Sequence, residues 1–80
     1  MTSEEIKRDL TEIFQDVFDD QSIVLTRETT ADDIEDWDSL SQITLLVSIE
    51  KKFKINLSFN EVQDLKNVGD MLDLIKNKIS

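Results

Sequence analysis

The chain has 80 residues, of which 39% are hydrophobic, and it contains no cysteine and no histidine. This length supports one domain, and the two missing residue types exclude a disulfide framework and a Cys/His zinc site, so apolar packing must hold the fold. The net charge of −9 argues against nucleic acids or an anionic membrane as partners and favours basic docking surfaces.

The composition favours an all-α fold because the chain has no proline and a single glycine, Gly69. Thr2 and Glu5 have the spacing of a capping box at the start of the first expected helix, which covers about residues 3–18. Its apolar side chains recur with helical spacing, at Ile6, Leu10, Ile13, Phe14, Val17 and Phe18.

Residues 19–38 lose this helical spacing and are predicted to form a long loop. The aliphatic residues interspersed in it favour an ordered loop. A second helix is expected from Ser39 to about Lys52, with Asp38 as its N-cap. Leu45 is expected to face outward, because it lies off the stripe formed by Leu40, Ile43, Leu46, Val47, Glu50 and Phe53.

The remaining sequence predicts a short helix and a final longer one. Ser58 and Glu61 form a second capping box before the short helix, and Asn67 can cap the last. The last helix carries apolar residues on one side, at Val68, Met71, Leu72, Ile75 and Ile79. We therefore predict one domain over residues 1–80, a bundle of three main helices plus one short helix, with the longest connection between the first two.

Few residues here suit catalysis, because histidine, cysteine and tyrosine are all missing. The acidic residues between Asp32 and Asp38 are interpreted as solvated charges, since acid–base catalysis requires a carboxyl group with a raised pKa. An EF-hand starting at Asp36 is excluded, because Ser41 and Val47 stand where glycine and glutamate are needed. We predict neither an enzyme nor a dedicated metal site, although clustered carboxylates can bind Mg²⁺ or Ca²⁺ weakly.

The most informative segment joins the long loop to the second helix and reads Asp36-Trp37-Asp38-Ser39-Leu40. A serine at the first helical position points its hydroxyl to solvent, where another enzyme can modify it, and a phosphate there would meet unpaired backbone N–H groups. Trp37 is expected to anchor the loop to the bundle. An Asp-Ser pair alone is also simply a good helix cap, so the wider pattern decides.

That wider pattern resembles the acyl carrier protein family over about residues 3–79. The resemblance is carried by Asp38-Ser39-Leu40, by Glu50, Phe53 and Ile55 at the end of the second helix, and by Val68-Gly69-Asp70. It implies that Ser39 bears a covalent 4′-phosphopantetheine, delivered from coenzyme A by a phosphopantetheinyl transferase, with Asp38 helping to hold Mg²⁺ and orient that reaction. The arm would carry an acyl group as a thioester. The implied acyl cavity is lined by Ile43, Val47, Phe53, Ile55 and Met71.

The resemblance also implies docking of partner enzymes on the second helix, where we expect an interface of Leu40, Ser41, Thr44, Leu45, Val47 and Glu50. Ser41 and Thr44 stand where fatty-acid-synthase carriers usually have acids, which favours a specialised pathway. The expected partners are the transferase and acyl-loading and acyl-using enzymes of lipid, fatty acid, polyketide or other specialised biosynthesis.

The N-terminal residues lack the positive charge and the apolar run of a signal peptide, and no apolar segment is long enough to span a membrane, so we expect the protein in the cytoplasm. We also expect it to be a monomer. Two alternatives stay open at this point. One is a peptidyl or aminoacyl carrier, which has the same Ser39 chemistry, and the other is an unmodified acidic protein-interaction module.

Overall fold

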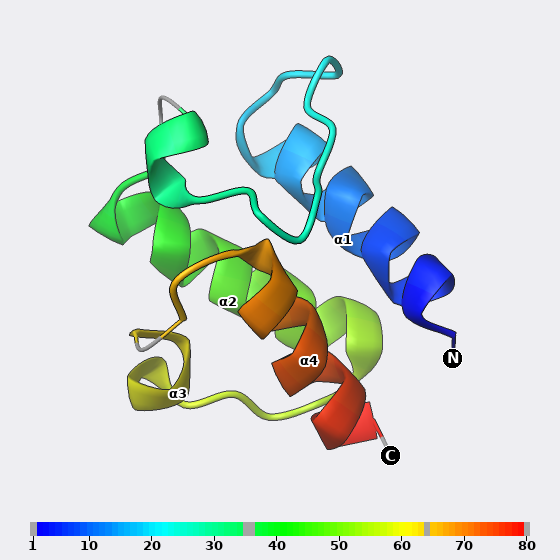
Figure 1. Cartoon of the computed structure of the whole chain (residues 1–80). Helices are drawn as coiled ribbons and strands as arrows, with labels where there is room; N and C mark the ends of the chain where they lie inside the picture. Colours follow the sequence, from blue (N-terminus) through cyan, green and yellow to red (C-terminus); the bar gives the residue numbers. More distant parts are fainter. Residues whose placement is uncertain (1, 35–36, 64, 80) are drawn as a thin grey trace.

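The computed structural model describes residues 2–34, 37–63 and 65–79. Within these ranges the chain forms helices α1 (Ser3–Val17), α2 (Ser39–Phe53), α3 (Phe59–Gln63) and α4 (Val68–Ile79), one 3₁₀ turn η1 (Ala31–Asp33), and no strand (Figure 1). The all-α prediction and the order of long and short helices are confirmed. The turn η1 in the long loop was not predicted.

The helix starts are fixed by the side chains that were expected to cap them. Thr2 Oγ1 accepts the backbone N–H of Glu5 at 3.2 Å, and Glu5 Oε1 accepts the backbone N–H of Thr2 at 3.1 Å. Ser58 and Glu61 exchange the same two bonds before α3, at 3.3 and 3.2 Å. Asn67 Oδ1 accepts a backbone N–H of α4 at 2.9 Å. These local bonds satisfy N–H groups that lack a partner inside the helix, which is why the sequence locates the helix starts well.

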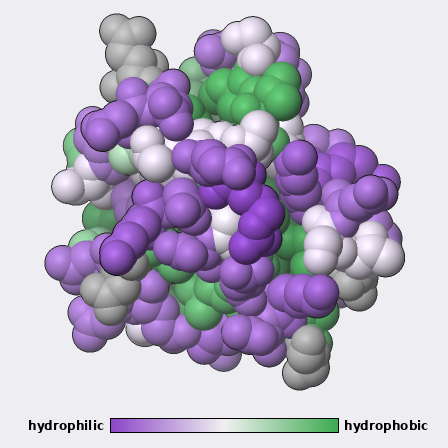
Figure 2. All heavy atoms as spheres, viewed as in Figure 1, coloured by the Kyte–Doolittle hydropathy of each residue, from purple (hydrophilic) through white to green (hydrophobic). Residues whose placement is uncertain are grey.

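One cluster of apolar side chains forms the core, with α1 packed against both α2 and α4. Helix α1 contributes the face that its periodicity predicts, and the visible surface is mostly hydrophilic with small apolar areas (Figure 2). The buried members of the cluster are Ile6, Leu10, Ile13, Phe14, Leu25, Leu45, Ile49, Leu57, Val62, Val68, Met71, Leu72 and Ile75.

Helix α2 is rotated about its axis relative to the sequence prediction. Leu45 is 0% exposed and Ile49 is 1% exposed, so the prediction that Leu45 faces outward is wrong. Leu40, Ile43 and Val47 are 76%, 47% and 43% exposed, and they form a stripe on the outer side. The physical reason is that α2 carries apolar residues around most of its circumference, so its own periodicity does not select one face.

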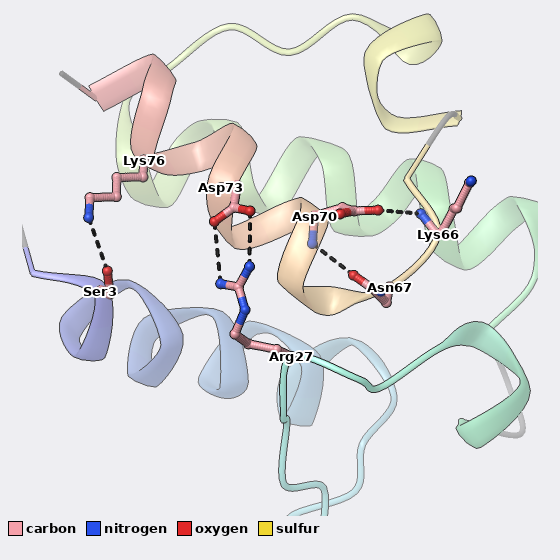
Figure 3. Close-up of polar contacts among 7 residues, drawn as sticks. All are labelled: Ser3, Arg27, Lys66, Asn67, Asp70, Asp73 and Lys76. Atoms are coloured by element: carbon pink, nitrogen blue, oxygen red, sulfur yellow. Dashed lines mark hydrogen bonds and ion pairs between the residues drawn. The ribbon is translucent and has the colours of Figure 1, made fainter.

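The long loop is tied to the start of α4 (Figure 3). The backbone N–H groups of Val68 and Gly69 donate to the carbonyl oxygens of Thr29 and Arg27, at 2.8 and 2.9 Å. The Arg27 guanidinium also pairs with the Asp73 carboxylate at 3.0 Å. Because the first helical N–H groups need partners from outside the helix, the loop supplies what α4 lacks. The prediction of an ordered loop is thereby confirmed for its described residues.

Candidate functional site

Ser39 is the first residue of α2, and it is exposed. The preceding residue, Asp38, has an extended backbone, and its Oδ1 accepts the N–H of Ser41 at 2.9 Å. The Asp38 carbonyl oxygen accepts the N–H of Gln42 at 2.9 Å, which is the first turn of the helix. The Asp38 cap therefore fixes the helix start so that Ser39 presents its hydroxyl at the surface.

The Asp38 carboxylate is held in its ionised form. Its pKa is lowered from 3.8, first by the hydrogen bond from the Ser41 backbone N–H and then by the bond from the Ser41 hydroxyl, at 3.0 Å. Hydrogen bonds donated to a carboxylate favour its charged form. A negative charge next to the Ser39 hydroxyl suits a reaction that uses a divalent cation.

Trp37 anchors the end of the long loop to the bundle, as expected. Its ring packs edge-on against Phe14, with ring centroids 5.1 Å apart, and Phe14 is fully buried. The indole N–H donates to Oε1 of Gln42, one turn into α2. This half-buried indole fixes the loop immediately before Ser39, because both its apolar body and its polar N–H have partners.

A pocket of about 290 Å³ opens beside Ser39, which is one of its lining residues. Apolar side chains from the loop, α3 and α4 form part of its wall, namely Trp37, Phe59, Val62 and Met71. Polar side chains form another part, including Gln42, Gln63 and Asn67. The pocket therefore lies at the junction of the long loop, the start of α2, α3 and the start of α4.

This pocket differs from the cavity that the sequence predicted. Of the five residues expected there, Met71 lines the pocket, whereas Ile43 and Val47 lie on the exposed outer stripe of α2. Phe53 and Ile55 pack half-buried against the core at the far end of α2. Ile43 and Val47 therefore do not reach this pocket, because α2 turns them outward, and the acyl cavity stays a prediction.

Gln42 and the α3 residues lie at the site but were not predicted from the sequence. Gln42 follows Ser39 by three positions, which places it close to the same helix face, and this spacing was the available signal. For the α3 residues no local signal existed, because their approach to Ser39 is a tertiary contact.

The predicted docking residues fall into three groups. Leu40, Thr44 and Val47 are exposed, together with Ile43, and they form an outward surface that starts next to Ser39. Leu45 does not belong to this surface because it is buried.

The other two predicted docking residues have local structural roles. The Ser41 hydroxyl donates to Asp38, and the half-buried Glu50 accepts the N–H of Leu57 at 3.2 Å. Ser41 thus belongs to the cap, and Glu50 to the loop that follows α2.

No cluster of three or more metal-ligating side chains occurs among the described residues. Glu35 and Asp36, two of the acids expected to attract cations weakly, lie outside the described residues. In the described part of the chain, no helix is both long enough and apolar enough to cross a membrane.

Comparisons with known proteins agree with this geometry. Residues 8–75 match the family described as "Phosphopantetheine attachment site". The acyl carrier protein of Acidothermus cellulolyticus is 36% identical over 77 residues, covering 96% of this chain and 92% of that one. A solution NMR structure of the holo acyl carrier protein from Geobacter metallireducens shares 57% identity and superposes with a TM-score of 0.84, over 90% of this chain and 83% of that chain.

This chain therefore belongs to the phosphopantetheine attachment site family, and it is a carrier of the acyl carrier protein type, whose prosthetic group is a covalently attached phosphopantetheine. The residues present fit that group. Ser39 offers an exposed hydroxyl at the start of α2, and the adjacent pocket of about 290 Å³ is open to a group attached there.

Proposed function

We propose that Ser39 is the attachment site of the phosphopantetheine arm and that the protein carries acyl intermediates between enzymes of lipid or specialised metabolite biosynthesis. The observation that carries this proposal is the exposed Ser39 hydroxyl, held at the first position of α2 by the Asp38 cap and placed at a pocket. When attached, the arm supplies a terminal thiol that holds cargo as a thioester.

Ser39 and Asp38 have distinct roles in the modification. Ser39 Oγ would give its proton to a base of the transferase and form the new bond to phosphorus, while a P–O bond of the coenzyme A pyrophosphate breaks and the nucleotide leaves as adenosine 3′,5′-bisphosphate. Asp38 keeps the helix start in place, and its ionised carboxylate attracts the Mg²⁺ used by the phosphopantetheinyl transferase. The catalytic groups belong to the transferase and to the cargo-using enzymes, so this chain acts as a carrier and not as an enzyme.

The outer stripe of α2 is the docking surface for these partners. Leu40, Ile43 and Val47 expose apolar area next to Ser39, with Thr44 among them. Exposed apolar patches bordered by polar residues are typical of interaction sites. The overall charge of −9 attracts basic partners and increases the rate of encounter. This nearly neutral stripe supports a specialised pathway, and we place the carrier in the cytoplasm as a monomer.

The attachment site is tested by intact mass after incubation with coenzyme A, Mg²⁺ and a broad-specificity phosphopantetheinyl transferase. Wild type should gain the mass of one arm, and Ser39→Ala should gain none. Ser48→Ala is the matched control, because it removes a serine hydroxyl from the same helix, away from the Asp38 cap, and should still be loaded. Loading of Ser39→Ala would place the arm elsewhere, and no loading of wild type would favour the unmodified interaction module.

The cargo class is tested on the loaded protein. Acyl-loading and aminoacyl-loading enzymes are offered separately, and the mass of the accepted group distinguishes an acyl carrier from a peptidyl or aminoacyl carrier. Acceptance of an acyl group supports the proposal, and exclusive acceptance of amino acids contradicts it.

A further inference from the structure

Ser39 lies in the middle of a short segment whose two ends are joined by a side-chain bond. The indole N–H of Trp37 donates to Oε1 of Gln42. The N–H of Gln42 donates to the Asp38 carbonyl oxygen at 2.9 Å, and the N–H of Ser41 donates to the Asp38 carboxylate, also at 2.9 Å. These three bonds hold the chain on both sides of Ser39, and none of them uses the Ser39 hydroxyl.

Of these three bonds, only the indole bond connects the first turn of α2 to the rest of the bundle. The Trp37 ring packs edge-on against Phe14 with ring centroids 5.1 Å apart, and Phe14 is 0% exposed. The Trp37 backbone N–H also donates to the Ile34 carbonyl oxygen at 3.2 Å. The core therefore sets the position of the indole, and through it the position of Gln42. The Asp38 cap does not replace this connection, because it joins residues of one helix start to each other.

The end of a helix is where local opening costs the least free energy, and Ser39 lies at such an end. A group transfer proceeds only while the attacking atom is held close to the reacting phosphorus and in a suitable direction, and this geometry contributes much of the rate. Each opening of the first turn moves the Ser39 hydroxyl out of that geometry. A bond that keeps the turn closed should therefore increase the rate of the transfer itself.

The indole bond lies apart from the proposed docking surface. Trp37 and Gln42 are half-buried, whereas Leu40, Ile43 and Val47 are exposed on the outer side of α2. Loss of the indole bond should leave this outer surface available to a partner. The effect is therefore expected on the reaction of the bound carrier and not on the binding of the carrier.

We propose that Trp37 and Gln42 are positioning residues for phosphopantetheine transfer, acting through the backbone of Ser39. In that transfer Ser39 Oγ gives its proton to a base of the transferase and bonds to phosphorus, while a P–O bond of the coenzyme A pyrophosphate breaks and adenosine 3′,5′-bisphosphate leaves. Both residues act by keeping the first turn of α2 closed. This inference rests on the proposed attachment of the arm to Ser39.

The test is the single-turnover rate of loading, measured with an excess of a broad-specificity phosphopantetheinyl transferase and with saturating coenzyme A and Mg²⁺. Varying the transferase concentration separates the maximal rate from the half-saturating concentration, and so separates reaction from binding. Trp37→Phe keeps a ring beside Phe14 and removes the N–H, and Gln42→Leu removes the acceptor. Each should lower the maximal rate about threefold to tenfold, as expected for one lost hydrogen bond, and change the half-saturating concentration less than about twofold.

Three further variants separate positioning from general stability. Gln42→Glu keeps an oxygen acceptor for the indole and should restore most of the wild-type rate. Ile75→Val removes one buried methyl group from α4 and should cost a similar amount of stability without slowing the loading. The double variant with Trp37→Phe and Gln42→Leu should be about as slow as either single variant, because both changes remove the same bond.

Hydrogen exchange measured by NMR tests the same bond without any loading. The backbone N–H groups of Ser41 and Gln42 should exchange with solvent about threefold to tenfold faster in Trp37→Phe, since opening of the first turn becomes easier. The indole N–H of Trp37 should exchange faster in Gln42→Leu than in wild type or in Gln42→Glu.

The outcomes distinguish this inference from the proposed attachment. Loading of wild type at Ser39, with an unchanged maximal rate in Trp37→Phe, refutes the positioning role and leaves the attachment site intact. An equal loss of rate in Ile75→Val also refutes the positioning role, because the effect would then be one of stability alone. No loading of wild type refutes both proposals, whereas faster amide exchange in Trp37→Phe would still show that the indole bond holds the first turn.

Discussion

The rotation of α2 is tested by making the same substitution on its two sides. Leu45→Ala truncates a side chain that is 0% exposed, and Leu40→Ala truncates one that is 76% exposed, five positions earlier on the same helix. Each buried carbon group that is removed costs about 0.8 kcal/mol of transfer free energy, and the cavity left behind increases this cost. We expect Leu45→Ala to lower the free energy of unfolding by about 3 kcal/mol.

Leu40→Ala should change the free energy of unfolding by no more than about 0.5 kcal/mol, because the Leu40 side chain buries little surface on folding and alanine is a strong helix former. The assay is urea unfolding followed by circular dichroism and by the fluorescence of Trp37, the only tryptophan. In a chain of this size, the buried substitution should lower the melting temperature by roughly 10–20 °C. Equal losses for the two variants, or a larger loss for Leu40→Ala, would refute the described rotation.

Three further predictions concern the loop contact, acid and salt. Gly69→Ala should destabilise the fold by about 1–2 kcal/mol, because the added Cβ would lie 2.9 Å from the Arg27 carbonyl oxygen. Denaturant unfolding measures this loss, and a gain in stability would contradict the close approach of Gly69 to Arg27. The pKa of Asp38 is lowered from 3.8 by its capping bonds, so its contribution to stability is present above pH 3.8 and is lost as the pH falls through the lower folded value. Asp38→Asn keeps a cap without a titrating group and should lose less stability between pH 5 and pH 3, whereas identical acid profiles would argue against a role for the Asp38 charge. Added NaCl or millimolar MgCl₂ should raise the melting temperature, since screening weakens the repulsion between like charges in a chain of charge −9. An unchanged melting temperature would show that this repulsion does not destabilise the fold appreciably.

Local chemistry determined the helices and the position of Ser39. The Thr2/Glu5 and Ser58/Glu61 capping boxes form as their spacing predicts, and Asp38 caps α2 directly before Ser39. Each of these interactions joins residues three positions apart, so the sequence alone specifies it. Helix α1 was equally predictable, because its apolar residues occupy one face and its polar residues the other.

Tertiary packing decided which side of α2 faces the core and what surrounds Ser39. Leu45 and Ile49 are buried against the rest of the bundle, although Leu40, Ile43 and Val47 form an equally apolar stripe. The pocket likewise joins Trp37, Val62 and Met71, which come from three separate elements. A helix that is apolar on several sides has no preferred face of its own, so the neighbouring elements select one by the surface they bury. That selection leaves the other apolar stripe of α2 outside, next to Ser39.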